Sequence, residues 1–101
     1  MELTTETTDG TTEIALSGEL TYEDTDQFDS LLNDLERGQS NACIVRFNDL
    51  QMIDSSGLRM LLLLHDVAKK KKMNLEFAGA HGDVRERIEF ARFQTIVTVR
   101  D

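Results

Sequence analysis

The segment Asp54-Ser55-Ser56-Gly57-Leu58 contains the residues of this chain best suited to chemistry. It precedes a leucine-rich helical pattern, and a Ser or Asp at such a position caps the free N–H groups of a helix's first turn. A hydroxyl at a helix N-terminus is also a favourable place for a phosphate, because exposed N–H groups and the positive end of the helix dipole receive its charge. Taken alone, the residues leave capping and phosphorylation both open.

The other reactive residue types do not complete a catalytic centre around these serines. A serine hydrolase needs a base oriented toward its nucleophile, but His65 follows Ser55 by ten residues, almost three helical turns, and the frame Gly-x-Ser-x-Gly is absent. His65 and His81 lack partners at metal-ligand spacing, and there is no glycine-rich phosphate loop with its lysine. The single Cys43 excludes an internal disulfide, and its apolar strand indicates a small buried hydrophobe. We expect a substrate of enzymes rather than an enzyme, with no metal and no cofactor.

Short strand patterns alternate with helical patterns, and these elements must position the serine segment. Asp9-Gly10 favours a tight hairpin between two early strands. The apolar run at 42–47, interrupted only by Arg46, is typical of a strand covered on both faces of a parallel sheet. Strands are predicted in the threonine-rich start and at 11–17, 42–47, 75–78 and 96–99. A short connection, 48–53, is expected to join the third strand to the serine segment.

Three helices are expected between these strands. Thr21, with Asp24 as a weak capping box, predicts the start of the first, and Gly38 predicts its end. Its apolar stripe has helical spacing: Phe28, Leu31, Leu32 and Leu35. The second helix begins near 55–57, and its predicted apolar face consists of Leu58, Leu61, Leu62, His65 and Ala68. The third is predicted at 83–91. This alternation indicates a single α/β domain over 1–101, with a mixed, mostly parallel sheet packed with amphipathic helices and 42–47 in its central strand.

Composition and charge restrict the partners of such a domain. The chain has 101 residues, of which 40% are hydrophobic, enough for one self-sufficient core. The longest apolar run, 60–64, is far shorter than a membrane span, and the start lacks a signal-peptide pattern, so we expect a cytoplasmic protein without membrane insertion. Residues 1–36 hold eleven acidic residues and no Lys or Arg, which argues against nucleic acid as a partner. The four lysines 69–72 are expected to complement a helix dipole.

Over about residues 2–99, the sequence resembles the STAS domain of bacterial anti-sigma factor antagonists. No single motif carries the resemblance, but an ordered set at the proper spacing does. The set comprises Leu16-Ser17-Gly18-Glu19-Leu20, the acidic amphipathic helix, Ile44-Val45-Arg46-Phe47-Asn48-Asp49-Leu50, and Met52-Ile53-Asp54-Ser55-Ser56-Gly57-Leu58. The resemblance implies a STAS fold and places the family's phosphoacceptor at Ser55.

The same resemblance implies a partner switch. The unphosphorylated domain would bind a serine-kinase anti-sigma factor and release its sigma factor, phosphorylation of Ser55 by that kinase would end binding, and a PP2C-type phosphatase would reset the switch. Around Ser55, the implied partner-binding residues are Asp54, Ser56, Gly57, Leu58 and Arg59, together with Thr21, Glu23 and Asp24.

Two of these positions depart from the family pattern. Thr21 stands where an acid often follows Gly-Glu-Leu, which moves the expected acidic contact to Glu23 or Asp24. Arg59 stands where a small or apolar residue is common, and there it could pair with the phosphate or select another partner.

Two other readings of the same fold remain open. The domain could be the STAS subunit of a lipid-transport ABC complex, where it would brace an ATPase and no serine need be modified. It could also be a partner switch with an output other than a sigma factor, such as biofilm formation or secretion.

Overall fold

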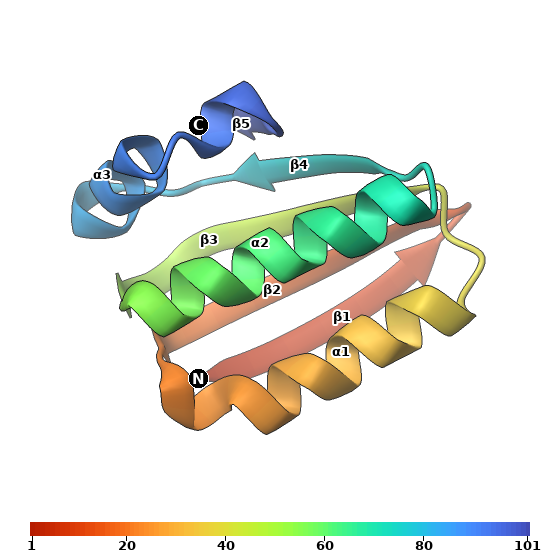
Figure 1. The fold of residues 1–101 in the computed structure, drawn as a ribbon, viewed down its shortest axis with the longest axis horizontal. Coiled ribbons are helices and arrows are strands. Elements are labelled where there is room, and N and C mark those ends of the chain that lie inside the picture. Colours follow the sequence, from red (N-terminus) through yellow and green to blue (C-terminus); the bar gives the residue numbers. More distant parts are fainter.

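A mixed sheet of five strands carries three α-helices, and two short 3-10 helices complete the chain (Figure 1). The computed structural model describes residues 1–101. The elements follow one another as β1 (Glu2–Thr8), β2 (Thr11–Leu20), η1 (Tyr22–Asp24), α1 (Thr25–Arg37), β3 (Ala42–Ile53), α2 (Ser55–Lys70), β4 (Asn74–Ala78), α3 (Gly82–Phe90), η2 (Phe93–Thr95) and β5 (Thr98–Arg100).

The strands lie in the sheet in their chain order, with β1 antiparallel to β2 and every other neighbouring pair parallel. The predicted α/β class, the mostly parallel sheet and the central place of 42–47 in β3 are therefore confirmed. The hairpin at Asp9-Gly10 is confirmed as well. Both of its residues have positive φ, 52° and 82°, the conformation that a two-residue hairpin turn requires.

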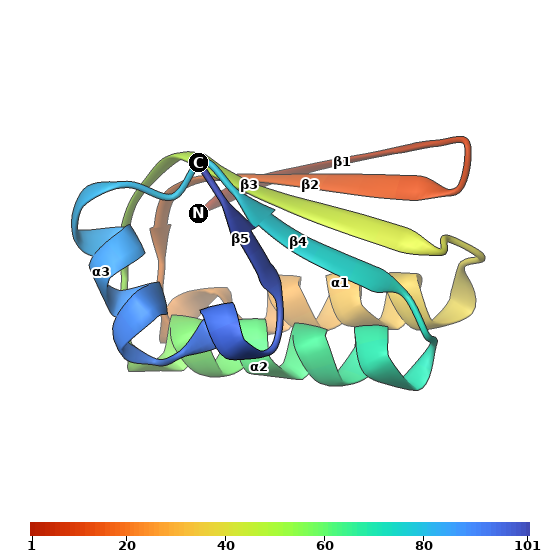
Figure 2. The ribbon, with the colours of Figure 1, turned by 90° about the horizontal axis from the view of Figure 1, so that it is seen from above.

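The helices α1 and α2 lie side by side beneath one face of the sheet, and the opposite face stays open (Figure 2). This one-sidedness follows from the strand order, because right-handed crossovers that always step in the same direction place their helices on the same face. The prediction that 42–47 is covered on both faces is wrong. Val45 and Phe47 are buried, whereas Arg46 points to the open face and pairs with Glu13 at 2.6 Å between Nε and Oε1.

Strand β3 is longer than predicted, because residues 48–53 continue the strand instead of forming a connection. They pair in parallel with the end of β2, where Gly18 faces Leu50 and Leu20 faces Ile53, and two register shifts interrupt the ladder. Leu50 and Ile53 are fully buried. The exposed polar residues around them, including Asn48 and Gln51, interrupt the apolar pattern from which a strand is predicted.

The start of α1 has the predicted capping box. The Thr21 hydroxyl accepts from the Glu23 N–H at 3.3 Å, and the Asp24 carboxylate accepts from the Thr21 N–H at 2.8 Å. The box caps η1, which continues directly into α1. The predicted stripe is confirmed, since its four apolar side chains are all buried, and the helix ends at Gly38 as expected.

Helix α2 buries a different face from the predicted one. Leu61 and Ala68 are buried as expected, but Leu62 is 46% exposed and His65 is only half-buried. Met60 and Leu64 take their places in the core. The run of four leucines satisfies more than one helical stripe, so the pattern alone left the rotation of the helix undetermined. None of the helices has both the length and the apolar composition needed to cross a bilayer.

The C-terminal elements are shifted slightly from their predicted bounds. Helix α3 ends at Phe90, and β5 begins at Thr98, two residues later than expected. Strand β5 pairs only with Glu76–Ala78 of β4. Ile96, predicted to start this strand, lies in the segment after η2 and is 44% exposed.

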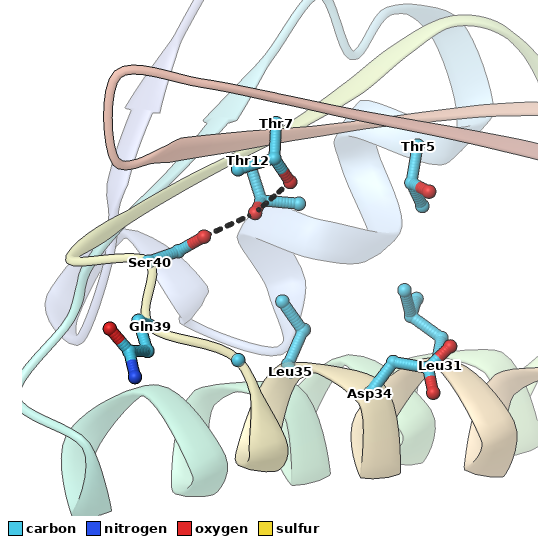
Figure 3. Close-up of a pocket in the computed structure, with 9 residues that line it drawn as sticks. Thr5, Thr7, Thr12, Leu31, Asp34, Leu35, Gln39 and Ser40 are labelled. Atoms are coloured by element: carbon cyan, nitrogen blue, oxygen red, sulfur yellow. Dashed lines mark hydrogen bonds between the residues drawn. The ribbon is translucent and has the colours of Figure 1, made fainter.

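A chain of hydroxyl groups joins the hairpin to the segment after α1 (Figure 3). Thr12 Oγ1 lies 2.8 Å from Thr7 Oγ1 and 2.6 Å from Ser40 Oγ, and Thr12 is one of only two buried polar residues. A hollow of about 180 Å³ beside this chain is bordered by Leu31 and Asp34 of α1. It lies at the end of the sheet opposite to Ser55, so it is separate from the serine segment.

Candidate functional site

The two segments singled out in the sequence meet because β2 and β3 end side by side. Leu20 and Ile53 are register partners at the ends of these parallel strands, and the next residues, Thr21 and Asp54, lead into η1 and α2. The Asp54 N–H donates to the Leu20 carbonyl at 3.2 Å, which holds the two ends together. Parallel pairing thus places the start of η1 next to the N-terminus of α2.

The helix cap at this site is Asp54. Its carboxylate Oδ1 accepts from the Gly57 N–H at 2.8 Å, which leaves the hydroxyls of both serines free of capping bonds. Ser55 is exposed and Ser56 is half-buried. Of the two roles expected for Ser56, a helix cap or a secondary hydroxyl, the structure therefore excludes the cap. The sequence alone left open whether a serine or Asp54 caps the helix, and the structure assigns the cap to Asp54 and leaves the Ser55 hydroxyl free.

Gly57 fixes α2 against both strands. A Cβ at this position would lie 2.6 Å from the Leu20 carbonyl oxygen and 2.6 Å from Cγ1 of Ile53. The helix backbone can approach the sheet this closely only because residue 57 has no side chain. Gly57 is buried, so its role at the site is to position the exposed Ser55.

Of the residues predicted near η1, one faces inward and one faces out. Asp24 is 9% exposed, and its carboxylate accepts from the Thr21 N–H and lies 3.2 Å from the amino group of Met1. These internal bonds give Asp24 a structural role. Glu23 is exposed and keeps its carboxylate available, and the neighbouring Tyr22 is 68% exposed.

An apolar surface adjoins Ser55 on the side of α3. One hollow of about 280 Å³ is lined by Ser55, Leu58, Arg59, Leu62, Ala91, Phe93 and Ile96. A second, of about 320 Å³, is lined by Leu58, Asp83, Glu86, Arg87, Phe90 and Ala91. Leu58 and Ala91 border both. Phe90 is 90% exposed at the end of α3, although a large apolar side chain usually gains stability from burial.

The sequence analysis identified Leu58 and Arg59 but missed the lining residues that come from the end of α3 and the segment after it. Leu62 was assigned to the core, and Phe90, Ala91 and Ile96 come from a segment more than 30 residues after Ser55. Only the tertiary fold brings that segment to α2. The pair Phe90 and Phe93 gave no signal either, because residues three apart lie on the same face of a helix and could both be buried.

Arg59 lies on the same wall as Ser55, four residues later on α2. Residues at this spacing are neighbours on a helix surface. Arg59 is exposed, borders the Ser55 hollow and forms no ion pair within the chain. Its guanidinium is therefore available to a negative charge at Ser55 or on a partner.

Comparison with known proteins places this arrangement in a family and a fold. A family model described as STAS domain matches residues 2–101. A putative anti-sigma factor antagonist from Thermotoga maritima superposes with a TM-score of 0.88 at 18% identity, over 98% of this chain and 86% of that one.

The anti-sigma factor antagonist SpoIIAA in its unphosphorylated form superposes with a TM-score of 0.79 at 22% identity, over 99% of this chain and 88% of that one. The Bacillus cell fate determinant SpoIIAA in its phosphorylated form gives 0.77 at 20% identity, over 97% and 90%. At these identities the likeness establishes the fold. No curated protein sequence matches significantly.

Proposed function

Because this chain belongs to the STAS domain family, we propose that it is an anti-sigma factor antagonist whose partner binding is controlled by phosphorylation of Ser55. The observation that carries the proposal is the exposed Ser55 hydroxyl at a helix N-terminus already capped by Asp54, beside an apolar surface. Its structural neighbour SpoIIAA has been solved in both unphosphorylated and phosphorylated forms. The proposed partners are a serine-kinase anti-sigma factor and a PP2C-type phosphatase.

In the unphosphorylated state, the partner would cover the two hollows around Leu58. Side chains such as Phe90 and Leu62 are exposed in the free domain, and covering them would supply hydrophobic stabilisation to the complex. The exposed carboxylate of Glu23 lies at the same end of the sheet and would contact a basic group of the partner. These contacts extend the site from α2 to α3 and η1.

Phosphorylation would act on this surface and leave the fold unchanged. A phosphate adds a charge of about −1.5 to −2, which the first-turn N–H groups and the dipole of α2 tolerate locally. At the partner surface the same charge would lie beside an apolar hollow and an acidic N-terminal third, so binding would lose affinity through desolvation, steric blocking and repulsion. A loss of about 3 kcal/mol corresponds to roughly hundredfold weaker binding. Arg59 would pair with part of this charge and moderate the effect.

The phosphoacceptor can be tested by incubating the chain with a serine-kinase anti-sigma factor and ATP, followed by peptide mass spectrometry. We expect phosphate on Ser55 in the parent and in Ser56→Ala, and none in Ser55→Ala. Ser55→Ala should still bind the kinase. Phosphate on Ser56, or equally on both serines, contradicts the assignment. No phosphate on either residue would favour the structural role in a transport complex.

The binding surface can be tested separately with a matched pair of leucine variants. Leu62 lines the Ser55 hollow, whereas Leu63 is similarly exposed but lines neither hollow. We expect Leu62→Ala to weaken binding of the kinase, as measured by calorimetry, and Leu63→Ala to leave it unchanged. Equal effects of the two variants would place the partner elsewhere on α2.

The mode of switching can be tested by comparing amide NMR shifts and partner affinity with and without phosphate. We expect shift changes confined to the neighbourhood of Ser55 together with a large loss of affinity. Ser55→Asp should imitate the loss only in part, because a carboxylate carries less charge and fewer acceptor oxygens than a phosphate. Shift changes spreading across the sheet would instead indicate a conformational switch.

A further inference from the structure

Another recess lies at the other end of α2, away from Ser55. It is a groove of about 430 Å³ between the C-terminal half of α2, the start of β4 and the segment 94–98, a volume within the range of roughly 300–1,000 Å³ typical of small-molecule sites. The groove exists because β5 pairs only from Glu76 onward, so no strand covers the outer edge of Asn74 and Leu75. Its floor includes the buried side chains of Ala68 and Val97.

The lining of this groove contains no acidic residue, although the chain as a whole is acidic. The chain has 19 acidic residues among 101, yet none of the eleven residues that line the groove is Asp or Glu. The lining instead contains Lys69 and His65, together with the polar side chains of Asn74, Gln94, Thr95 and Thr98. A lining that contains Lys69 and several polar side chains but no carboxylate suits an anionic ligand with a polar body.

The lysine run shows why Lys69 is available to such a ligand. Lys71 Nζ donates to the carbonyls of Glu36 at 2.7 Å and Gly38 at 2.6 Å, at the C-terminus of α1. Lys70 Nζ lies 4.0 Å from the Glu36 carboxylate. Lys69 borders the groove and forms no ion pair. Lys69 and Lys70 lie in the last turn of α2, as the predicted complement to the helix dipole requires, but Lys69, unlike Lys70 and Lys71, has no partner on α1.

His65, on the same wall, has an unsatisfied polar atom in its ring. Its Nδ1 is the one buried side-chain nitrogen or oxygen of the chain without a hydrogen-bond partner, and the nearest carboxylate oxygen, from Asp66, is 3.7 Å away. A buried polar atom without a partner costs free energy, so its presence in a native fold requires an explanation. Because His65 lines the groove, a hydrogen-bonding ligand held there would lie beside this polar side chain.

We propose that this groove binds a small phosphate monoester with a hydroxyl-bearing body. Lys69 would bind the phosphate. On the opposite wall, the Thr98 hydroxyl and the Gln94 Oε1 would bind the hydroxyl groups, since Gln94 Nε2 already donates to the Glu89 carbonyl at 3.2 Å. The site is independent of the partner switch. Ile96 lines both this groove and the Ser55 hollow, so an occupied groove would border the partner surface.

The proposal is tested by titrating the ¹⁵N-labelled chain with ribose 5-phosphate as probe and with ribose as the uncharged control. We expect saturable amide shifts confined to residues 65–75 and 94–98 with ribose 5-phosphate, and much weaker binding of ribose. Lys69→Gln should weaken binding at least about tenfold, the equivalent of one charge-assisted hydrogen bond. Lys70→Gln removes the same charge one residue away and should bind like the parent.

The outcomes that overturn the proposal are equally definite. The first is that ribose 5-phosphate saturates no amide, the second is that ribose binds as tightly, and the third is that Lys70→Gln weakens binding as much as Lys69→Gln. The first two results exclude the phosphate-monoester class, and the third reduces the effect to the general charge of the helix end. None of them depends on phosphorylation of Ser55, so the two proposals fail independently.

Discussion

Leu61 and Leu64 of α2 are fully buried against the sheet, whereas Leu62 and Leu63, between them in the chain, are 46% and 37% exposed. The four residues are chemically identical and differ only in the direction in which the helix presents them. On the inner face, leucine contributes to the free energy of folding. On the outer face, Leu62 borders the hollow beside Ser55 and is available to a partner. The comparison shows that one helix can divide a single residue type between stability and recognition.

The two faces also differ in how closely they are packed. Gly57 on the inner face admits no additional atom, while the outer face near Leu58 has two open hollows. Substitutions on the inner face should therefore change stability, and those on the outer face should change binding with little effect on stability. The predictions below test this division.

The largest effect is expected for Leu64→Ala. Leu64 is 1% exposed, and truncation of a fully buried leucine costs about 2–5 kcal/mol of unfolding free energy through lost burial and a residual cavity. Leu63→Ala is the matched control and should cost less than about 1 kcal/mol. Urea denaturation of both variants measures the difference. Similar costs for the two would mean that the rotation of α2 described above is incorrect.

Gly57→Ala should be the next most damaging change. Its Cβ would overlap the Leu20 carbonyl oxygen, which is held by the Asp54 N–H and cannot yield as a flexible side chain would. Overpacking of this kind costs about 1–3 kcal/mol. Gly38→Ala, where the nearest atom to the added Cβ is 3.3 Å away and φ is −76°, provides the control with a smaller expected cost. A Gly57→Ala protein with parental stability in urea would show that α2 can move away from β2.

Cys43 tests the buried side of β3 through the pH dependence of stability. Burial raises the pKa of its thiol from 9.0 to about 12, so the folded state keeps the thiol protonated where the unfolded chain ionises. The stability that the buried, protonated thiol contributes to the folded state is therefore fully present below pH 9 and is lost progressively as the pH rises toward 12. By pH 10 the loss amounts to about 1.4 kcal/mol. Urea unfolding at pH 8, 9 and 10 should show this slope in the parent and a flatter one in Cys43→Ala. Identical slopes would refute a protonated, buried thiol.

The smallest effect concerns the helix cap. Asp54→Ala removes the carboxylate that accepts from the Gly57 N–H and should cost about 1 kcal/mol. Ser55→Ala should leave the unfolding free energy within about 0.5 kcal/mol of the parent, because its hydroxyl makes no capping bond. Denaturation midpoints of the two variants separate the roles of these adjacent residues. If Ser55→Ala lowered the unfolding free energy by more than this, the Ser55 hydroxyl would be shown to cap the helix and would not be free.

The sequence predicted an element correctly wherever its local pattern was compatible with only one structure. The stripe of α1 has a single helical phase, and Asp9-Gly10 has a single tight turn, so both predictions are confirmed. The leucines of α2 fit several phases, and only contact with the sheet selects one. The extension of β3 over 48–53 depends on pairing with the end of β2, which no local pattern encodes.

The candidate site was predictable in part for the same reason. The segment around Ser55 is contiguous in the chain, and its position at a helix N-terminus follows from local residue types. The opposite wall of the hollow, with Ala91 and Ile96, comes from a distant segment, and its position is a property of the sheet order. The departures at Thr21 and Arg59 remain predictions about partner choice.

The place of β1 at the margin of the sheet has a consequence for self-association. Strand β1 pairs only with β2, so one side of its backbone presents unpaired N–H and C=O groups along seven residues. Such an edge can recruit a strand from another molecule, and charged side chains are a common protection against this. Here Glu2 and Glu6 supply like charges that repel a second copy of the same edge. High salt screens this repulsion, so concentrated salt would favour strand-to-strand aggregation of an otherwise intact domain.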